Sequence, residues 1–134
     1  MGTEITVHFE IKVFGKWEHY SSPSITRNYE MFGWLARVRY PELQHIQVKG
    51  LPEDISISTQ IGWNRIEVNA YEPSWLTAEE IVKWVDKFPE QLDYFTSLKS
   101  ELGRLYGNSY SGWVKYPEDY PQEIEDLRMV FWFS

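Results

Sequence analysis

Apolar and polar residues alternate along residues 3–14 of the chain. Apolar side chains stand at 5, 7, 9, 11 and 13, and polar ones at 6, 8, 10 and 12. Because successive side chains of a strand point to opposite faces, this pattern predicts a half-buried strand. Gly15 and Lys16 suit a two-residue turn, after which residues 17–20 return as a second strand. That turn would place Lys12 opposite His19 and Phe14 opposite Trp17 on the outer face of the hairpin. A three-residue loop would shift the pairing by one residue and would therefore reverse the faces to which these side chains point.

A helical period replaces the alternation after Pro23. Thr26 is predicted to be the N-cap of a helix over residues 27–38. Asn28 would fall within the apolar stripe of this helix, so its side chain needs a backbone or ligand partner. Beyond it, residues 41–50 are predicted to be irregular with a short extended piece at 45–48. Residues 52–54 begin a helix of one or two turns, and residues 62–74 form an aromatic-rich loop.

The strongest local signal is a helix start at Thr77. Thr77 and Glu80 form a capping box, and Leu76 with Ile81 forms the accompanying hydrophobic staple. This helix is predicted to run to residue 88, where Pro89 stops it. A further helix follows over 92–105, then a loop over 108–121 and a strand over 127–133.

This order of elements predicts a single α+β domain over residues 1–134. A small antiparallel sheet, made of the N-terminal hairpin plus the C-terminal strand, would pack with one face against three to four helices.

Composition narrows the classes of function. The chain has no cysteine, which excludes disulfides and thiolate metal sites. Its net charge is −7 and its pI about 4.9, so we expect no polymeric nucleic acid as a partner. No basic-then-apolar leader and no apolar run of about 20 residues occur, so we expect a cytoplasmic protein that does not enter membranes. Aromatic residues reach 17%, with seven tryptophans, and such residues are enriched at recognition surfaces that stack on flat ligands.

Catalytic and metal motifs are not recognisable. His8, His19 and His45 lack the spacing of a helical zinc site, and no HExxH motif occurs. His8 and Glu10 share a strand face and could ligate jointly, but strand alternation alone often produces such pairs. We therefore expect no metal, no cofactor and no catalytic residue.

Arginines and aromatic residues instead suggest a ligand site. Arginine binds phosphate through two parallel hydrogen bonds, and aromatic rings stack on bases. The alternative is structural, because an arginine on an amphipathic helix often only covers core surface with its stem. The predicted ligand-binding residues are His8, His19, Tyr20, Arg27, Asn28, Trp34, Arg39 and Trp75.

Several short motifs are spread over most of the chain: GKWEHY (15–20), RNYxxFxxLARVR (27–39), GLPED (50–54), SWLT (74–77) and DLRxxFWF (126–133). Together these motifs resemble a widespread family of small, uncharacterised phage and prophage proteins. Members often begin with a Cys-Asp-Ile-His pattern and end in Trp-Phe-Asp-Asn, whereas this chain has Thr-Glu-Ile-Thr at 3–6 and ends in Ser134. The resemblance implies a cytoplasmic phage accessory protein, and such proteins include sponges for nucleotide second messengers of host immunity.

Three functions remain open at this point. The first is a homo-oligomeric sponge that sequesters a small nucleotide-type ligand. The second is an enzyme that degrades such a nucleotide, with His8, Glu10 and His19 as acid, base or metal groups. The third is a protein-interaction inhibitor of a host effector that uses the aromatic surface.

Overall fold

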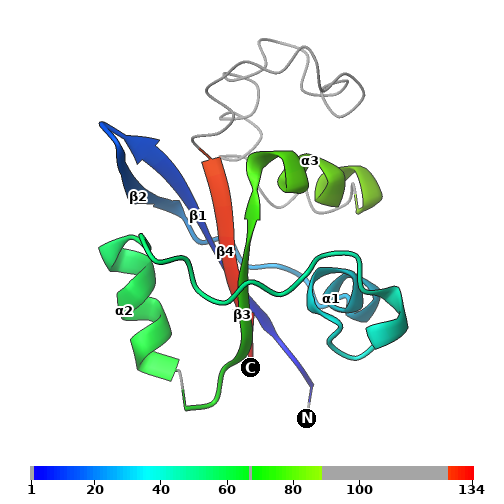
Figure 1. The fold of residues 1–134 in the computed structure, drawn as a ribbon. Coiled ribbons are helices and arrows are strands. Elements are labelled where there is room, and N and C mark those ends of the chain that lie inside the picture. Colours follow the sequence, from blue (N-terminus) through cyan, green and yellow to red (C-terminus); the bar gives the residue numbers. More distant parts are fainter. Residues whose placement is uncertain (1, 67, 89–126) are drawn as a thin grey trace.

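The computed structural model describes residues 2–66, 68–88 and 127–134 (Figure 1). Its strands are β1 (Ile5–Val13), β2 (Lys16–Ser21), β3 (Tyr71–Thr77) and β4 (Leu127–Phe133), and its helices are α1 (Tyr29–Ala36), the 3₁₀ turn η1 (Pro41–Leu43), α2 (Ile57–Ile66) and α3 (Ala78–Lys87). The strands form one sheet in the order β2-β1-β4-β3. All neighbouring strands are antiparallel, which confirms the predicted α+β class.

The C-terminal strand β4 lies in the middle of this sheet. It pairs with β1 from Ile5–Phe133 to Ile11–Leu127, and all seven of its residues are buried. This burial on both faces means that β4 needs cover from two sides. None of the helices in the described part of the chain is long and apolar enough to cross a bilayer.

One face of the sheet packs against α1 and α3. Phe9, Met129 and Phe131 project from this face into a core that also contains Phe32 of α1 and Trp84 of α3. The opposite face meets α2, because a methyl group at Gly62 would lie 3.1 Å from His8 Nε2. Figure 1 shows α2 on one side of the strands and α1 and α3 on the other. The expectation that helices cover only one face was therefore wrong.

The turn of the N-terminal hairpin also differs from the prediction. Val13 pairs with Lys16, so the two turn residues are Phe14 and Gly15, with φ of 51° and 80°. Two positive φ values match the right-handed twist of a hairpin, as in a type I′ turn, and glycine takes the second position. Lys12 consequently lies opposite Trp17, and Phe14 projects fully exposed from the tip. Each residue of β1 near the turn therefore pairs with a β2 residue two positions earlier than predicted. Because side chains alternate with a period of two, every side chain keeps its predicted face.

Helix α1 is shorter than predicted at both ends. Its N-cap is Asn28, whose Oδ1 accepts a hydrogen bond of 3.1 Å from the Met31 N–H, in place of Thr26. Arg37 ends the helix in the left-handed conformation with φ of 58°. Asn28 therefore has the backbone partner that its place in an apolar stripe requires.

Two elements in the middle of the chain differ from the prediction. The predicted loop over 62–74 contains the second half of α2 and the start of β3, and α2 begins at Ile57 instead of near residue 52. No strand forms at 45–48. Helix α2 gave no amphipathic signal because its buried residue is Thr59, whereas Ile57 is 80% exposed. The start of β3 is irregular, with φ of 51° at Glu72.

The signals at Thr77 and at the C-terminal strand were confirmed. Thr77 Oγ1 accepts from the Glu80 N–H, and Glu80 Oε1 accepts from the Thr77 N–H. Strand β4 spans the predicted residues. The predicted helix over 92–105 and loop over 108–121 lie outside the described residues.

We expect Thr77→Ala to lower the free energy of unfolding by about 1 kcal/mol, because an N–H of the first turn of α3 loses its acceptor. Thr77→Ser keeps the acceptor oxygen and should stay close to the wild type. Urea unfolding of the three proteins measures the difference. Equal losses in both variants would mean that the methyl group of Thr77, and not the cap, carries the stability.

Candidate functional site

A buried ion pair joins β1 to β4. The strand register places Glu10 opposite Arg128, and both residues are almost fully buried. Arg128 Nε and Nη2 each lie 2.7 Å from Glu10 Oε1. Removing two opposite charges from water is costly, so this pair depends on hydrogen bonds that satisfy the remaining atoms.

The second carboxylate oxygen of Glu10 holds the start of α2. Oε2 accepts hydrogen bonds from the Ser56 N–H at 3.0 Å and from the Thr59 hydroxyl at 2.7 Å. Ser56 Oγ in turn lies 2.9 Å from Thr59 Oγ1. Burial by itself would raise the pKa of Glu10, but the hydrogen bonds from Ser56, Thr59 and Arg128 outweigh it and lower this pKa. Glu10 is therefore an anion with both oxygens occupied.

Asp54 brings the loop before α2 to the same arginine. Arg128 Nη1 donates to Asp54 Oδ1 at 2.7 Å, and Nη2 donates to the Asp54 carbonyl oxygen at 3.0 Å. The hydrogen bond from Arg128 lowers the pKa of Asp54, whose side chain is 66% exposed. Asp54 is thus a fixed carboxylate at the protein surface.

Asp54 and Arg128 belong to the lining of an open groove of about 850 Å³, which we call the tryptophan groove; it is lined by Trp17, Lys49, Leu51, Pro52, Glu53, Asp54, Trp75 and Arg128. The guanidinium carbon of Arg128 lies 4.1 Å from the ring centre of Trp17 and 6.0 Å from that of Trp75. Both tryptophans are only partly buried. Two aromatic walls thus stand on either side of an immobilised cation.

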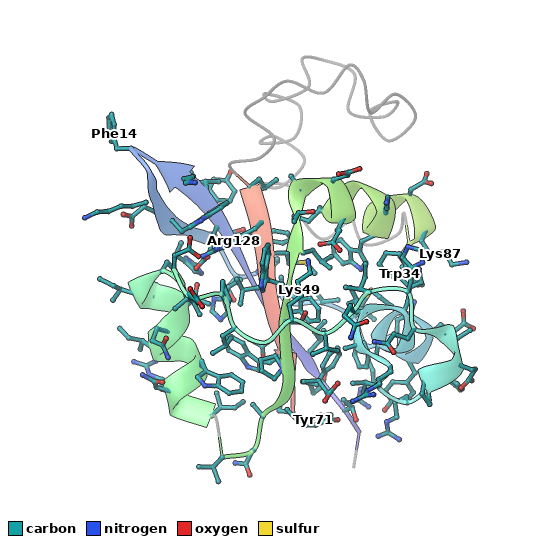
Figure 2. All side chains as sticks on the ribbon, viewed as in Figure 1. Phe14, Trp34, Lys49, Tyr71, Lys87 and Arg128 are labelled. Carbon is teal, nitrogen blue, oxygen red and sulfur yellow. The ribbon has the colours of Figure 1, made fainter. Side chains whose placement is uncertain are left out.

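A lysine lies over each of these tryptophan rings. Lys12 Nζ is 5.6 Å from the ring centre of Trp17, and Lys49 Nζ is 4.3 Å from that of Trp75. Lys49 also pairs with Glu80 of the α3 capping box. Figure 2 shows Lys49 beside Arg128 near the centre of the molecule.

His8 and His19 lie on the same sheet face, and their rings are hydrogen-bonded, with His8 Nδ1 3.1 Å from His19 Nε2. The His8 ring also packs against Trp132, with ring centres 5.1 Å apart. Burial, together with the charge of His19, lowers the pKa of His8 to about 4. His8 is therefore neutral near pH 7. The described residues contain no cluster of three His, Asp or Glu side chains suited to a metal ion.

Most other predicted site residues lie elsewhere. Arg27 pairs with Glu4, and Arg39 donates to Thr3 Oγ1 at 3.1 Å and lies over the Tyr29 ring. These contacts gather just before the first residue of β1, whereas Lys12 and the groove lie at its far end. Seven residues of strand separate the two ends, or roughly 23 Å.

Trp34 and Tyr20 are mainly part of the packing. Trp34 is buried, stacks on His45 with ring centres 4.9 Å apart and contacts Phe88. Tyr20 packs against the core, next to the irregular pairing between β1 and β2. Of the predicted set, only Trp75 lines the tryptophan groove.

Sequence reasoning missed the residues that build the groove. Arg128 is a charged side chain inside an otherwise apolar strand, and that contrast could have marked it as a paired, buried group. The alternation placed Trp17 and Glu10 on the correct face of the sheet. Their contacts with Arg128 could not be predicted, because these contacts follow only from the order of the strands. Asp54 was interpreted as a helix start, although α2 begins three residues later.

We expect Arg128→Met to lower the free energy of unfolding by about 3–5 kcal/mol, because it leaves the Glu10 carboxylate buried without its cation. The double change Glu10→Gln with Arg128→Met removes both charges and should recover part of the loss. Urea unfolding of the single and double variants measures this. A double variant as unstable as the sum of both single variants would show that the two charges do not interact.

The His8 pKa predicts a pH dependence of stability. The folded value of about 4 lies below the ordinary 6.5, so the unfolded chain binds more protons between these pH values. The free energy of unfolding should therefore fall as the pH decreases from about 6.5 towards 4. His8→Gln removes this titrating group and should flatten the slope, as measured by urea unfolding across this pH range. Equal slopes in the variant and the wild type would contradict the assignment to His8.

Comparison with known proteins adds no assignment to this site. No protein-family model matches the chain, and no curated protein or solved structure does so. The candidate site therefore depends on the geometry described above.

Proposed function

We propose that the protein is a non-catalytic binding protein for a small nucleotide-type ligand, whose base stacks in the tryptophan groove. The observation that carries the proposal is the pair of partly exposed tryptophans, Trp17 and Trp75, on either side of the fixed Arg128. Stacking of a base on an aromatic side chain is worth about 1–3 kcal/mol and tolerates different bases. The groove volume of about 850 Å³ lies within the usual range for ligand sites, about 300–1,000 Å³.

The walls are held in place before any ligand binds. Arg128 is fixed by Glu10 and Asp54, and its guanidinium supports the ring of Trp17. Lys49, paired with Glu80, supports the ring of Trp75. Walls that are already ordered reduce the entropy lost on binding.

The phosphate groups of such a ligand would be held by lysine. Arg128 already donates to Glu10 and Asp54. Lys12 is exposed and lies at the Trp17 wall, so its ammonium group can turn towards a phosphate. Asp54 and Glu53 on the rim repel phosphate, and the positive charge of Lys12, which also acts on Asp54, offsets part of this repulsion.

Binding without turnover is supported by the state of the acidic and basic groups. Both oxygens of Glu10 are engaged in hydrogen bonds to the protein, and a general base needs a free lone pair directed at the substrate. His8 is hydrogen-bonded to His19 and packed on Trp132. An enzyme that uses these three residues would first have to break these contacts.

The biological role that we propose for this binder is that of a phage sponge, as the resemblance to small phage proteins implies. Such a protein would act in the cytoplasm of the infected host and sequester a nucleotide second messenger of an anti-phage defence. A protein-interaction inhibitor is the second candidate, favoured by the exposed apolar side chains of Ile57 and Ile61 on α2, which are 80% and 46% exposed.

The experiment that separates these functions uses ligand in excess over protein. The wild type is incubated with a panel of cyclic dinucleotides, cyclic trinucleotides and cyclic ADP-ribose isomers, and bound ligand is released by heat and identified. A sponge removes ligand up to its site stoichiometry and returns it intact. Products that accumulate beyond that stoichiometry would establish an enzyme, and ligand that stays free throughout would leave the protein-interaction function.

We expect Trp75→Ala and Trp17→Ala each to weaken ligand binding roughly 5- to 150-fold, since each removes one stacking wall. Isothermal titration calorimetry measures the dissociation constants. Ile57→Ala on the exposed side of α2 is the matched control and should bind like the wild type. Arg27→Ala should also retain its affinity, and a loss there would place the ligand at the opposite end of β1.

A further inference from the structure

Strand β2 leaves one backbone edge without a partner in the described sheet. It is the outer strand beside β1, and its six residues contain no proline. The other outer strand, β3, contains Pro73 and a left-handed residue at Glu72, both of which obstruct further pairing. Open strand edges tend to pair with another strand, so proteins usually obstruct or cover them.

We propose that the β2 edge pairs with β2 of a second copy of this chain, antiparallel and centred on Trp17. The inference concerns an interaction surface and does not depend on the proposed ligand. The hairpin register, the charges along β2 and the exposed tip of the hairpin all point to this arrangement.

The register of the hairpin determines which backbone groups point outward. The Val13–Lys16 pair that closes a two-residue turn exchanges hydrogen bonds within the hairpin, and hydrogen-bonded pairs alternate with non-bonded ones along an antiparallel ladder. Trp17 belongs to the next, non-bonded pair with Lys12. Its N–H and C=O are therefore directed to the free edge, where two copies of Trp17 can exchange both hydrogen bonds.

Charge selects this register over its neighbours. Centring on Trp17 places Lys16 of each copy opposite Glu18 of the other, which gives two attractive cross-strand pairs. Centring on Glu18 would place two carboxylates opposite each other, and like charges in that position are destabilising. Registers beyond Glu18 use the part of β2 where the pairing with β1 shifts, between the partners His19 and Ser21.

The exposed hairpin tip fits the same arrangement. Phe14 is fully exposed and projects from the tip in Figure 2. In the register centred on Trp17, it lies near Tyr20 of the second copy. The pairing would also bring the two tryptophan grooves together at the symmetry axis, because Trp17 is a wall of each.

The test is a charge exchange at the two exposed positions Lys16 and Glu18. Both point away from the face that carries Trp17, so the groove is left unchanged. Analytical ultracentrifugation over a concentration series should show a monomer–dimer equilibrium for the wild type. K16E and E18K each turn two attractive pairs into repulsive ones and should raise the dissociation constant at least roughly tenfold.

Two recombinations test the register itself. The double variant K16E/E18K restores both attractive pairs and should dimerise like the wild type. An equimolar mixture of K16E and E18K should form heterodimers, because one chain then offers two negative side chains and the other two positive ones. Circular dichroism should show the wild-type fold in every variant.

A wild type that stays monomeric at all concentrations overturns the proposal. So does a dimer that neither single reversal weakens, or a mixture of the two single variants in which no heterodimer forms. These results are independent of ligand binding, which is measured separately on the same proteins.

Discussion

The ion pair between Arg128 and Glu10 is the interaction on which the rest of the described structure depends. It joins the last strand of the chain to the first, 118 residues away, in the middle of the sheet. The same two side chains also reach Asp54 and the start of α2. One buried pair therefore fixes the strand order, the position of α2 and the floor of the tryptophan groove. Each charge is satisfied only when all of these segments are in place. A partly assembled sheet would therefore bury the two charges without the hydrogen bonds that compensate for their removal from water.

The parts that could be predicted from the sequence are those specified by neighbouring residues. The alternation over residues 5–13, the capping box at Thr77 and the strand at 127–133 each depend on contacts within a few positions. The hairpin turn was placed one residue late because a glycine suits either turn position, and only the twist of the paired strands selects between them. The N-cap of α1 was likewise placed two residues early, since Thr26 and Asn28 are both good caps.

The candidate site could not be assembled in the same way. Its residues come from β1, β2, β3, β4 and the loop before α2, so it exists only once the sheet order is known. The predicted residues that cluster in the sequence around 27–39 face the other end of β1, where Arg27 and Arg39 contact Glu4 and Thr3. Trp75 was identified because its residue type is unusual, but its assignment to a loop hid the wall that it forms with Lys49.

Helix α2 is attached to the sheet in an uncommon way, with consequences for how the protein moves. Its buried residue is a threonine bonded to Glu10, and two of its isoleucines face outward. The helix also has an apolar contact with the sheet, because Trp63 packs on the buried Trp132 with ring centres 5.3 Å apart. Detaching α2 would therefore expose the sheet face that carries His8 and Trp132, and it would remove the hydrogen bonds from Ser56 and Thr59 to Glu10. Such an opening loses apolar burial and leaves a buried carboxylate short of donors at the same time, so the movement of α2 is coupled to the charge of Glu10.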